Sequence, residues 1–334
     1  MPTLHDVAKR AGVSTATVSK VLSNTPYFSD ETRDKVMSAV QELGYRPNLA
    51  ARALSSGRTH AVAVVFPYIY DTIFNDPLVM QILEGVEAIC NEHGYNIILS
   101  TPRLTEDGPD ERYRQLIQSG YVEGVIAIDN VSIASVSHIA RDYDVPVVVI
   151  GYHNATFSVR SDDFAGGCKA AQYILDLGHE HIGIITVPSH LNLAIEQRMR
   201  GIQQTFSEAR IHHQQIYYTH GDFSAASGRK AMAELRDKYP EITAVICLND
   251  RMAIGAIQWL MEHEVAIPDD ISVVGYDDIP LVGVFSPAIT TISQHAAQLG
   301  RAAVKMLFEV LQDKTPTPVV FQPDLIIRGS ARAL

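Results

Sequence analysis

The sequence predicts an all-α helix-turn-helix head followed by an α/β body of two lobes, each built on a parallel sheet. Residues 4–22 keep the three-to-four spacing of apolar side chains that is typical of amphipathic helices, with one interruption at residues 12–14. From residue 60 onward, short apolar runs alternate with helical stretches in two sets of four. Such runs are typical of parallel strands whose sheet is covered by helices on both faces.

The interruption at residues 12–14 indicates a turn between two short helices. Gly12 allows a left-handed backbone conformation, and Ser14 suits the N-cap of the following helix. A third helix is expected after Ser29, with acidic residues in its first turn and a stop at Gly44. Three such helices can close one small core.

The second helix carries a group of small or polar side chains outside its apolar face. Hydroxyls, one methyl group and one cation suit a surface that enters the major groove of DNA. On this pattern alone, a plain helical hairpin is the alternative. The candidate DNA-binding residues of this helix are Thr15, Ala16, Thr17, Ser19 and Lys20.

The charge distribution agrees with a head that meets phosphates. The chain of 334 residues has a formal net charge of -11. Its first 60 residues nevertheless carry eight Lys and Arg against five Asp and Glu, an excess of three positive charges. A basic head on an acidic body suits nucleic-acid binding by the head alone.

Composition excludes several other classes of protein. The apolar fraction of 46% and the charged fraction of 19% are typical of a soluble globular protein. We expect a cytoplasmic protein without membrane contact, because the N-terminus lacks a signal peptide and no apolar run has the length of a membrane span. The three cysteines and thirteen histidines match no metal, disulfide or catalytic pattern. We therefore expect no enzyme activity, cofactor or metal.

A short helix is expected between head and body, from Pro47 to about Ser56, followed by Gly57. A helix of two to three turns is marginal alone, so a second copy, DNA or both should stabilise it. Leu54 has no local core to enter and is a candidate wedge between base steps of a minor groove. The alternative is an ordinary linker helix with Leu54 packed on the body.

Residues 3–57 closely resemble the DNA-binding head and hinge of the lactose/galactose repressor (LacI/GalR) family of transcription regulators. The matching segments are TLHDVAKRAGVSTATVSKVL, ETRDKV, ELGYRPN and AARAL. The resemblance implies a homodimer that places one recognition helix in each half-site of operator DNA. It also implies that Thr15, Ala16 and Lys20 face bases, that Thr17 and Ser19 lie near phosphates, and that Leu54 opens the central base step.

The resemblance continues over nearly all of residues 60–334 and implies the type I periplasmic-binding-protein fold. The eight expected strands cover residues 61–66, 96–100, 125–128, 147–150, 182–186, 216–219, 244–248 and 272–275. The expected domains are a DNA-binding domain (1–46), a hinge helix and linker (47–60) and an effector-binding and dimerisation domain (61–334). The last comprises an N-lobe (about 61–161 and 292–320) and a C-lobe (about 162–291 and 321–334). Crossings between the lobes are expected near residues 160–162, 291–293 and 319–322, and dimer contacts from helices 77–93 and 250–263.

Ligands of open parallel sheets bind beyond the carboxyl ends of the strands. The residues that follow the expected strands include carboxylates, amides, one arginine and aromatic rings, which suit a polyhydroxylated ligand. Helix capping is the alternative for several of them, and it is the expected role of Asp163, Asp222 and Asp250. The candidate effector-binding residues after the strands are Tyr70, Phe74, Asp76, Asn192, Arg198, Phe223, Asn249 and Asp277.

The family resemblance selects among these candidates. Arg198 and Asp277 align with the effector-binding arginine and aspartate of the family, Asn249 and Phe223 with further pocket positions, and Asp162 with an effector contact of some members. Gly151 departs from members that bind sugar hydroxyls through an Asp at that position. Asn192 departs from the purine-binding branch, which has an Arg there.

We therefore expect a dimeric repressor that binds operator DNA under the control of a small-molecule effector, with a saccharide preferred. A regulator that responds to a purine or another metabolite is the alternative within the family. A sugar-binding receptor without a DNA role is the alternative outside it, and it would need a signal peptide.

Overall fold

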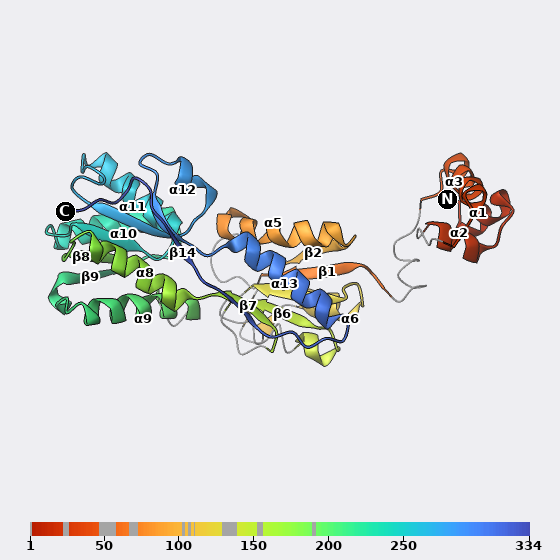
Figure 1. Cartoon of the computed structure of the whole chain (residues 1–334), viewed down its shortest axis with the longest axis horizontal. Helices are drawn as coiled ribbons and strands as arrows, with labels where there is room; N and C mark the ends of the chain where they lie inside the picture. Colours follow the sequence, from red (N-terminus) through yellow and green to blue (C-terminus); the bar gives the residue numbers. More distant parts are fainter. Residues whose placement is uncertain are drawn as a thin grey trace. The chain divides into compact units, whose positions relative to one another are not determined.

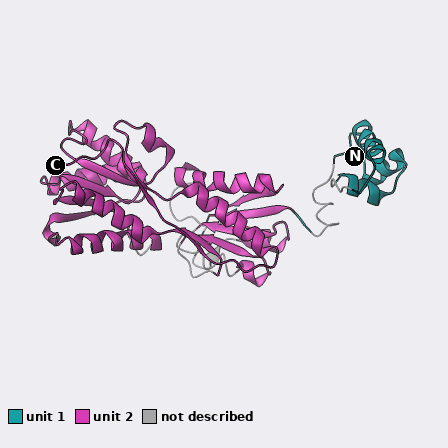
Figure 2. Ribbon diagram, viewed as in Figure 1, with its two compact units in different colours: residues 1–59 teal, residues 60–334 magenta. Residues whose placement is uncertain are grey.

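The computed structural model of the chain consists of two compact units, residues 1–59 and residues 60–334 (Figure 2). The structure describes residues 2–22, 27–46, 58–66, 73–101, 104–105, 108–109, 111–128, 139–151, 156–188 and 192–334. The expected hinge helix, Leu54 and Tyr70 lie outside these ranges. No helix of the described residues is long and apolar enough to cross a membrane.

The first unit contains the three expected helices, α1 (Leu4–Ala11), α2 (Thr15–Leu22) and α3 (Asp30–Leu43). Their core is small and consists of the buried side chains of Val7, Ala8, Val18, Val21, Val36 and Ala39. The predicted helix-turn-helix is confirmed.

Local hydrogen bonds set the ends of these helices. Gly12 has a φ of 68°, and Ser14 Oγ accepts a hydrogen bond from the backbone N–H of Thr17 at 3.1 Å, as the sequence predicted. A capping box at the start of α1 was not predicted. There the backbone N–H of Asp6 donates to Thr3 Oγ1, and the backbone N–H of Thr3 donates to Asp6 Oδ2 at 2.8 Å.

The first lobe of the second unit is a six-stranded sheet in which every neighbouring pair is parallel. Its order is β13 (Val319–Phe321), β7 (Ser158–Ser161), β6 (Val147–Ile150), β5 (Gly124–Ile128), β1 (Ala61–Val65) and β2 (Asn96–Ser100). Helices α5 (Pro77–Glu92) and α13 (Ala296–Val310) share a core with one face of this sheet, and α6 (Glu111–Gln118) shares a core with the other.

The second lobe repeats this plan, with one antiparallel strand at the edge. Its order is β14 (Asp324–Ile326), β12 (Thr290–Ser293), β11 (Ser272–Asp277), β10 (Ala244–Cys247), β8 (Ile182–Thr186) and β9 (Ile216–His220), and only β14 is antiparallel. Helices α8 (Asp163–Asp176) and α9 (Leu193–Glu208) cover one face, and α10 (Ala225–Lys238) and α11 (Asp250–Glu262) cover the other (Figure 1).

The eight expected strands are present, within two residues at each end. Four further strands, β7, β12, β13 and β14, lie where the chain passes between the lobes, and three or four residues were too few to show a pattern. The chain changes sheet just after β7, β12 and β13. The remaining short elements are η1 (Ile73–Asn75), β3 (Leu104–Thr105), β4 (Gly108–Pro109), η3 (His213–Gln215) and α12 (Pro280–Val284).

Glycines allow the covering helices to touch in pairs. A Cβ atom on Gly167 of α8 would lie 2.1 Å from the carbonyl oxygen of Arg198, and one on Gly201 of α9 would lie 2.2 Å from that of Phe164. The pair α5 and α13 and the pair α10 and α11 meet through glycines in the same way.

Candidate functional site

The side of α2 that was expected to meet DNA lies on the surface of the head. Thr15, Ala16, Ser19 and Lys20 are exposed and Thr17 is half-buried, whereas Val18 and Val21 of the same helix are in the core. Thr17 also shares a hydrogen bond of 2.9 Å with the hydroxyl of Ser14. The head therefore presents a polar helix surface on a buried apolar support.

In the second lobe, Arg198 of α9 is buried in a group of polar contacts. Its Nε donates to Oδ1 of Asp163 at 2.8 Å, and its Nη1 donates to the carbonyl oxygen of Leu248 at 2.6 Å. The guanidinium carbon lies 3.7 Å from the centre of the Tyr276 ring, whose hydroxyl donates to Asp163 Oδ1 at 3.2 Å. We call Arg198, Asp163, Tyr276 and Asp277 the Arg198 cluster.

Asp277 completes the Arg198 cluster at the carboxyl end of β11. Its Oδ1 lies 3.6 Å from Arg198 Nη1 and accepts a hydrogen bond of 2.5 Å from Gln294 Nε2. Asp277 and Asp278 have φ angles of 118° and 60°, a region that residues with a Cβ seldom adopt. Such backbone strain is concentrated at functional sites, where the surrounding structure maintains it.

The electrostatics follow from burial. Burial raises the pKa of Asp163, although Arg198 acts against this shift. Burial also raises the pKa of Asp277 well above its ordinary value, again against the effect of Arg198 and with the help of the charges of Asp250 and Asp76. Burial alone would lower the pKa of Arg198. The carboxylates of Asp163 and Asp277, together with Tyr276, raise this pKa by more than burial lowers it. The arginine therefore remains charged, and its charge is compensated internally.

Four of the other expected effector-binding residues are helix N-caps. Asn249 Oδ1 accepts from the backbone N–H of Met252, and its Nδ2 donates to the carbonyl oxygen of Phe223 at 3.0 Å. Asn192, Asp162 and Asp76 accept backbone hydrogen bonds at the starts of α9, α8 and α5 in the same manner. Phe223 is half-buried, and Phe74 is 61% exposed.

The expected capping roles of Asp163, Asp222 and Asp250 are wrong. The N-caps are Asp162, Ser224 and Asn249, which lie one or two residues away from the expected capping residues. Asp250 instead accepts hydrogen bonds from Thr291 Oγ1 and from the backbone N–H of Ile279, and Asp222 accepts from that of Ser224.

Two contacts connect the lobe that holds the Arg198 cluster to the first lobe. Gln81 of α5 donates from Nε2 to the carbonyl oxygen of Asp278 at 3.1 Å. Leu78, also on α5, packs against the cores of both lobes. The strained strand end that carries Asp277 is thus bonded to a helix of the other lobe.

Sequence reasoning missed Asp163, the partner of Arg198, and Gln294, the partner of Asp277. Asp163 was assigned to capping, and Gln294 was not singled out, although both stand where the chain passes between lobes. Their position at the crossings could have indicated a role, because residues there lie next to both lobes.

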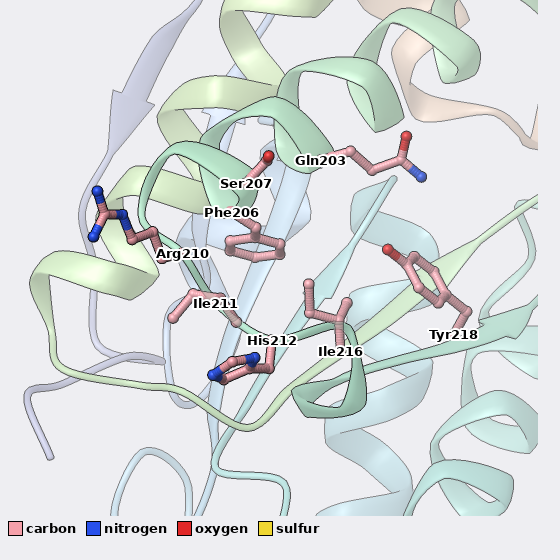
Figure 3. A pocket seen from close by; sticks show the side chains of 8 residues that line it. All are labelled: Gln203, Phe206, Ser207, Arg210, Ile211, His212, Ile216 and Tyr218. Carbon is pink, nitrogen blue, oxygen red and sulfur yellow. The ribbon is translucent and has the colours of Figure 1, made fainter.

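A separate hollow of about 660 Å³ lies between the carboxyl-terminal half of α9 and the strand β9 (Figure 3). It contains none of the expected binding residues, and it is lined by Gln203, Phe206, Ser207, Arg210, Ile211, His212, Ile216 and Tyr218.

Two segments of the chain match known protein families. Residues 3–48 match bacterial regulatory proteins of the lacI family, and residues 171–331 match the periplasmic binding protein-like domain. The HTH-type transcriptional repressor PurR of Histophilus somni (strain 2336) is 32% identical over 344 residues, covering 100% of both chains.

Solved structures with the same architecture cover the whole chain. The lac repressor dimer bound to operator and the anti-inducer ONPF is 25% identical with a TM-score of 0.86, covering 99% of both chains. A complex of the transcriptional regulator CelR with cellobiose is 28% identical with a TM-score of 0.72, covering 99% of this chain and 100% of that one.

Proposed function

The chain belongs to the lacI family of bacterial regulatory proteins and is a DNA-binding transcriptional repressor, and we propose that a small molecule bound between its two lobes controls DNA binding. The observation that carries this proposal is the Arg198 cluster. It lies at the carboxyl end of β11, where ligands of parallel sheets bind, and the side chain of Gln81 in the first lobe donates a hydrogen bond to the carbonyl oxygen of Asp278, the residue after Asp277.

The DNA contacts of the proposal come from α2 and the hinge. Thr15, Ala16 and Lys20 contact base edges in the major groove, and Thr17 and Ser19 contact phosphates. Leu54 enters the minor groove between two base steps. The exposure of the α2 side chains supports this assignment.

For the effector, we put a purine base or nucleoside first and a saccharide second. The full-length relatives named PurR favour the purine alternative over the saccharide that the departures at Gly151 and Asn192 favoured. The similarity to CelR with bound cellobiose keeps the saccharide as the second candidate. Both classes of ligand carry hydrogen-bond donors for Asp277 and a face that can stack on Phe223.

The proposed coupling runs through the turn at Asp277 and Asp278. A ligand that donates a hydrogen bond to Asp277 alters the conformation of this turn. The hydrogen bond from Gln81 to the carbonyl oxygen of Asp278 then transmits the shift to α5. Movement between the lobes then alters the hinge that precedes β1. The coupling free energy needs to be only about 1–3 kcal/mol to change operator affinity 5- to 150-fold.

The repressor acts as a homodimer in this proposal. Phe74, Met80, Leu281 and Val284 are exposed apolar side chains near the start of α5 and on α12. Phe74, Met80 and Pro280 line one hollow of about 280 Å³. An apolar surface of this kind is typical of a protein interface. Trp259, on α11, packs partly against the core of its own lobe.

A ligand screen tests the proposal. The full chain is heated with purine bases, nucleosides, mono- and disaccharides, and each stabilising compound is added to a complex of the repressor with DNA selected from random duplexes. At least one purine is expected to raise the Tm and to change the DNA dissociation constant. Stabilisation by saccharides alone would contradict the preference for purines, and no effect of any bound compound on DNA affinity would contradict the proposed control.

A further inference from the structure

We propose that Asp163 sets the charge of the effector, so that the site accepts uncharged ligands and rejects anionic ones. This inference rests on the proposed function, because it concerns the same site between the lobes. It goes further in naming the residue that neutralises Arg198 before any ligand arrives.

An anionic ligand would normally pair with a buried arginine, because guanidinium and carboxylate or phosphate form strong, charge-assisted hydrogen bonds. In this protein that partner is already present within the chain. The hydrogen bond from Arg198 Nε to Asp163 Oδ1 is 2.8 Å long, and only 6% and 4% of the two side chains are exposed. The positive charge of Arg198 is therefore not available to attract an anion.

Asp277 adds a second carboxylate to the same guanidinium, with its Oδ1 at 3.6 Å from Nη1. Its Oδ1 accepts from Gln294, whereas its Oδ2 makes no hydrogen bond to any residue that the structure describes. The side chain is more than nine-tenths buried, and this oxygen has acceptor capacity left. A bound ligand that presents an N–H or O–H group can donate to it, whereas an anion offers no donor.

The other charged groups around the site do not reverse this balance. Arg160 acts electrostatically on Asp163, and Arg251 acts on Asp76. Together with Arg198 they face the carboxylates of Asp163, Asp76 and Asp277, and Asp250 adds to the negative potential at Asp277. A phosphate or carboxylate would therefore find each of these cations already facing a carboxyl group of the chain.

The packing of α8 and α9 holds Asp163 in this position. Asp163 is the first residue of α8, and the two helices touch at Gly167 and Gly201. The Tyr276 hydroxyl, which also donates to Asp163, occupies space that a Cβ atom on Gly166 would need, at 2.1 Å. Because three elements fix the pair, a ligand cannot displace Asp163 without leaving a buried charge unpaired.

The accepted class is thus uncharged molecules with several hydrogen-bond donors, such as purine bases, nucleosides and neutral sugars. The rejected class is their phosphorylated or carboxylated derivatives.

Inorganic phosphate is the probe that tests the inference without knowledge of the effector. Its affinity is measured by calorimetry for the full-length wild type, for Asp163→Asn, and for Asp269→Asn, a control that removes an exposed carboxylate paired with Arg332. Asp163→Asn is expected to bind phosphate at least tenfold more tightly than the other two proteins. Equal affinities for all three would overturn the inference. Phosphate bound by the basic head is common to all three proteins, and Asp269→Asn accounts for the loss of one negative charge from the body.

A matched pair of ligands gives a second test that needs only the wild type. Inosine is expected to bind at least tenfold more tightly than inosine 5′-monophosphate, and ribose more tightly than ribose 5-phosphate. Tighter binding of a phosphorylated member would overturn the inference, even if Asp163→Asn failed to fold. Failure of the proposed function has a different signature: the charge preference holds, but bound ligand leaves operator affinity unchanged.

Discussion

The head and the Arg198 cluster differ in the distance along the chain over which their contacts act. In the head, the hydrogen bonds that set the starts of α1 and α2 join residues three positions apart. In the body, the bonds of Arg198 to Asp163 and Leu248 and the bond of Tyr276 to Asp163 span 35, 50 and 113 positions. Local patterns therefore define the DNA-binding surface, whereas only the folded body defines the site for the effector.

The two regions also differ in the burial of their functional side chains. The polar residues of α2 are mostly exposed and lie outside the apolar core of the head, where substitutions usually change stability by less than about 0.5 kcal/mol. The charges of the Arg198 cluster are buried and compensate one another, so that function and stability depend on the same groups. The predictions below test this contrast.

The largest effect is expected from Arg198→Met. The substitution leaves the buried carboxylates of Asp163 and Asp277 without their cation, and breaking a buried ion pair in this way costs about 3–5 kcal/mol. Trp259 is the only tryptophan of the chain, so its fluorescence reports unfolding of the body alone. Arg200→Met is the matched control, because Arg200 is exposed two residues along α9 and donates a hydrogen bond to Gln197 of the same helix. A stability loss below about 1 kcal/mol for Arg198→Met would mean that the cluster is not a buried unit.

Leu54→Ala tests the hinge, which neither region contains. If the Leu54 side chain separates two base steps, its removal loses a contact that is made only at the operator. Unstacking a base step costs a few kcal/mol, and the inserted side chain offsets this cost. Operator affinity is expected to fall more than tenfold, with little change in affinity for unrelated DNA. Equal losses for both DNAs would exclude the wedge.

Lys20→Ala tests whether the exposed surface of α2 reads bases. Loss of a direct base contact is expected to cost about 1–3 kcal/mol and to relax the preference at one operator position, with unchanged stability of the head. The control is Lys35→Ala on α3, which removes a lysine bonded to Glu31. Selection of bound sequences from random duplexes would show the relaxed position, and an unaltered base preference would refute direct readout by Lys20.

The last difference is a pH dependence of opposite sign in the two regions. Burial raises the pKa of Asp250 from its ordinary value of 3.8 to about 7. Between these two pH values Asp250 is therefore protonated in the folded body but ionised in the unfolded chain. This contribution to stability is complete below pH 4 and is lost as the pH rises to 7, at up to about 1.4 kcal/mol per pH unit. In the head, hydrogen bonds from Thr3 and from Lys35 lower the pKa values of Asp6 and Glu31, so stability there falls as the pH drops through these values.

Unfolding of the body, followed by Trp259 fluorescence, and of the head, followed by hydrogen exchange, would separate these two dependences. Asp250→Asn is expected to reduce the slope of the body between pH 4 and 7 without altering the head. An unchanged slope in this variant would assign the pH dependence to other groups.

The sequence predicted most of the fold, because helix caps, apolar spacing and buried strand runs act over few residues. Gly12, Ser14 and Gly44 set the helix ends where expected, and all eight expected strands form. The strands at the crossings were not predicted, because they are short and pair with strands from distant parts of the chain. For the same reason Asp163 was given a local capping role, when its partners are Arg198 and Tyr276.

The central claim is that a ligand at the Arg198 cluster controls the head, and operator affinity with and without ligand tests it most directly. Fluorescence anisotropy gives the dissociation constant of full-length wild type and of Asp277→Asn, with the compound that the ligand screen selects. The ligand is expected to change wild-type affinity by about 5- to 150-fold. In Asp277→Asn the ligand should change operator affinity less than twofold. The operator affinity of this variant without ligand should match that of the wild type. An equal response of both proteins, or a ligand that binds wild type without changing its operator affinity, would contradict the account.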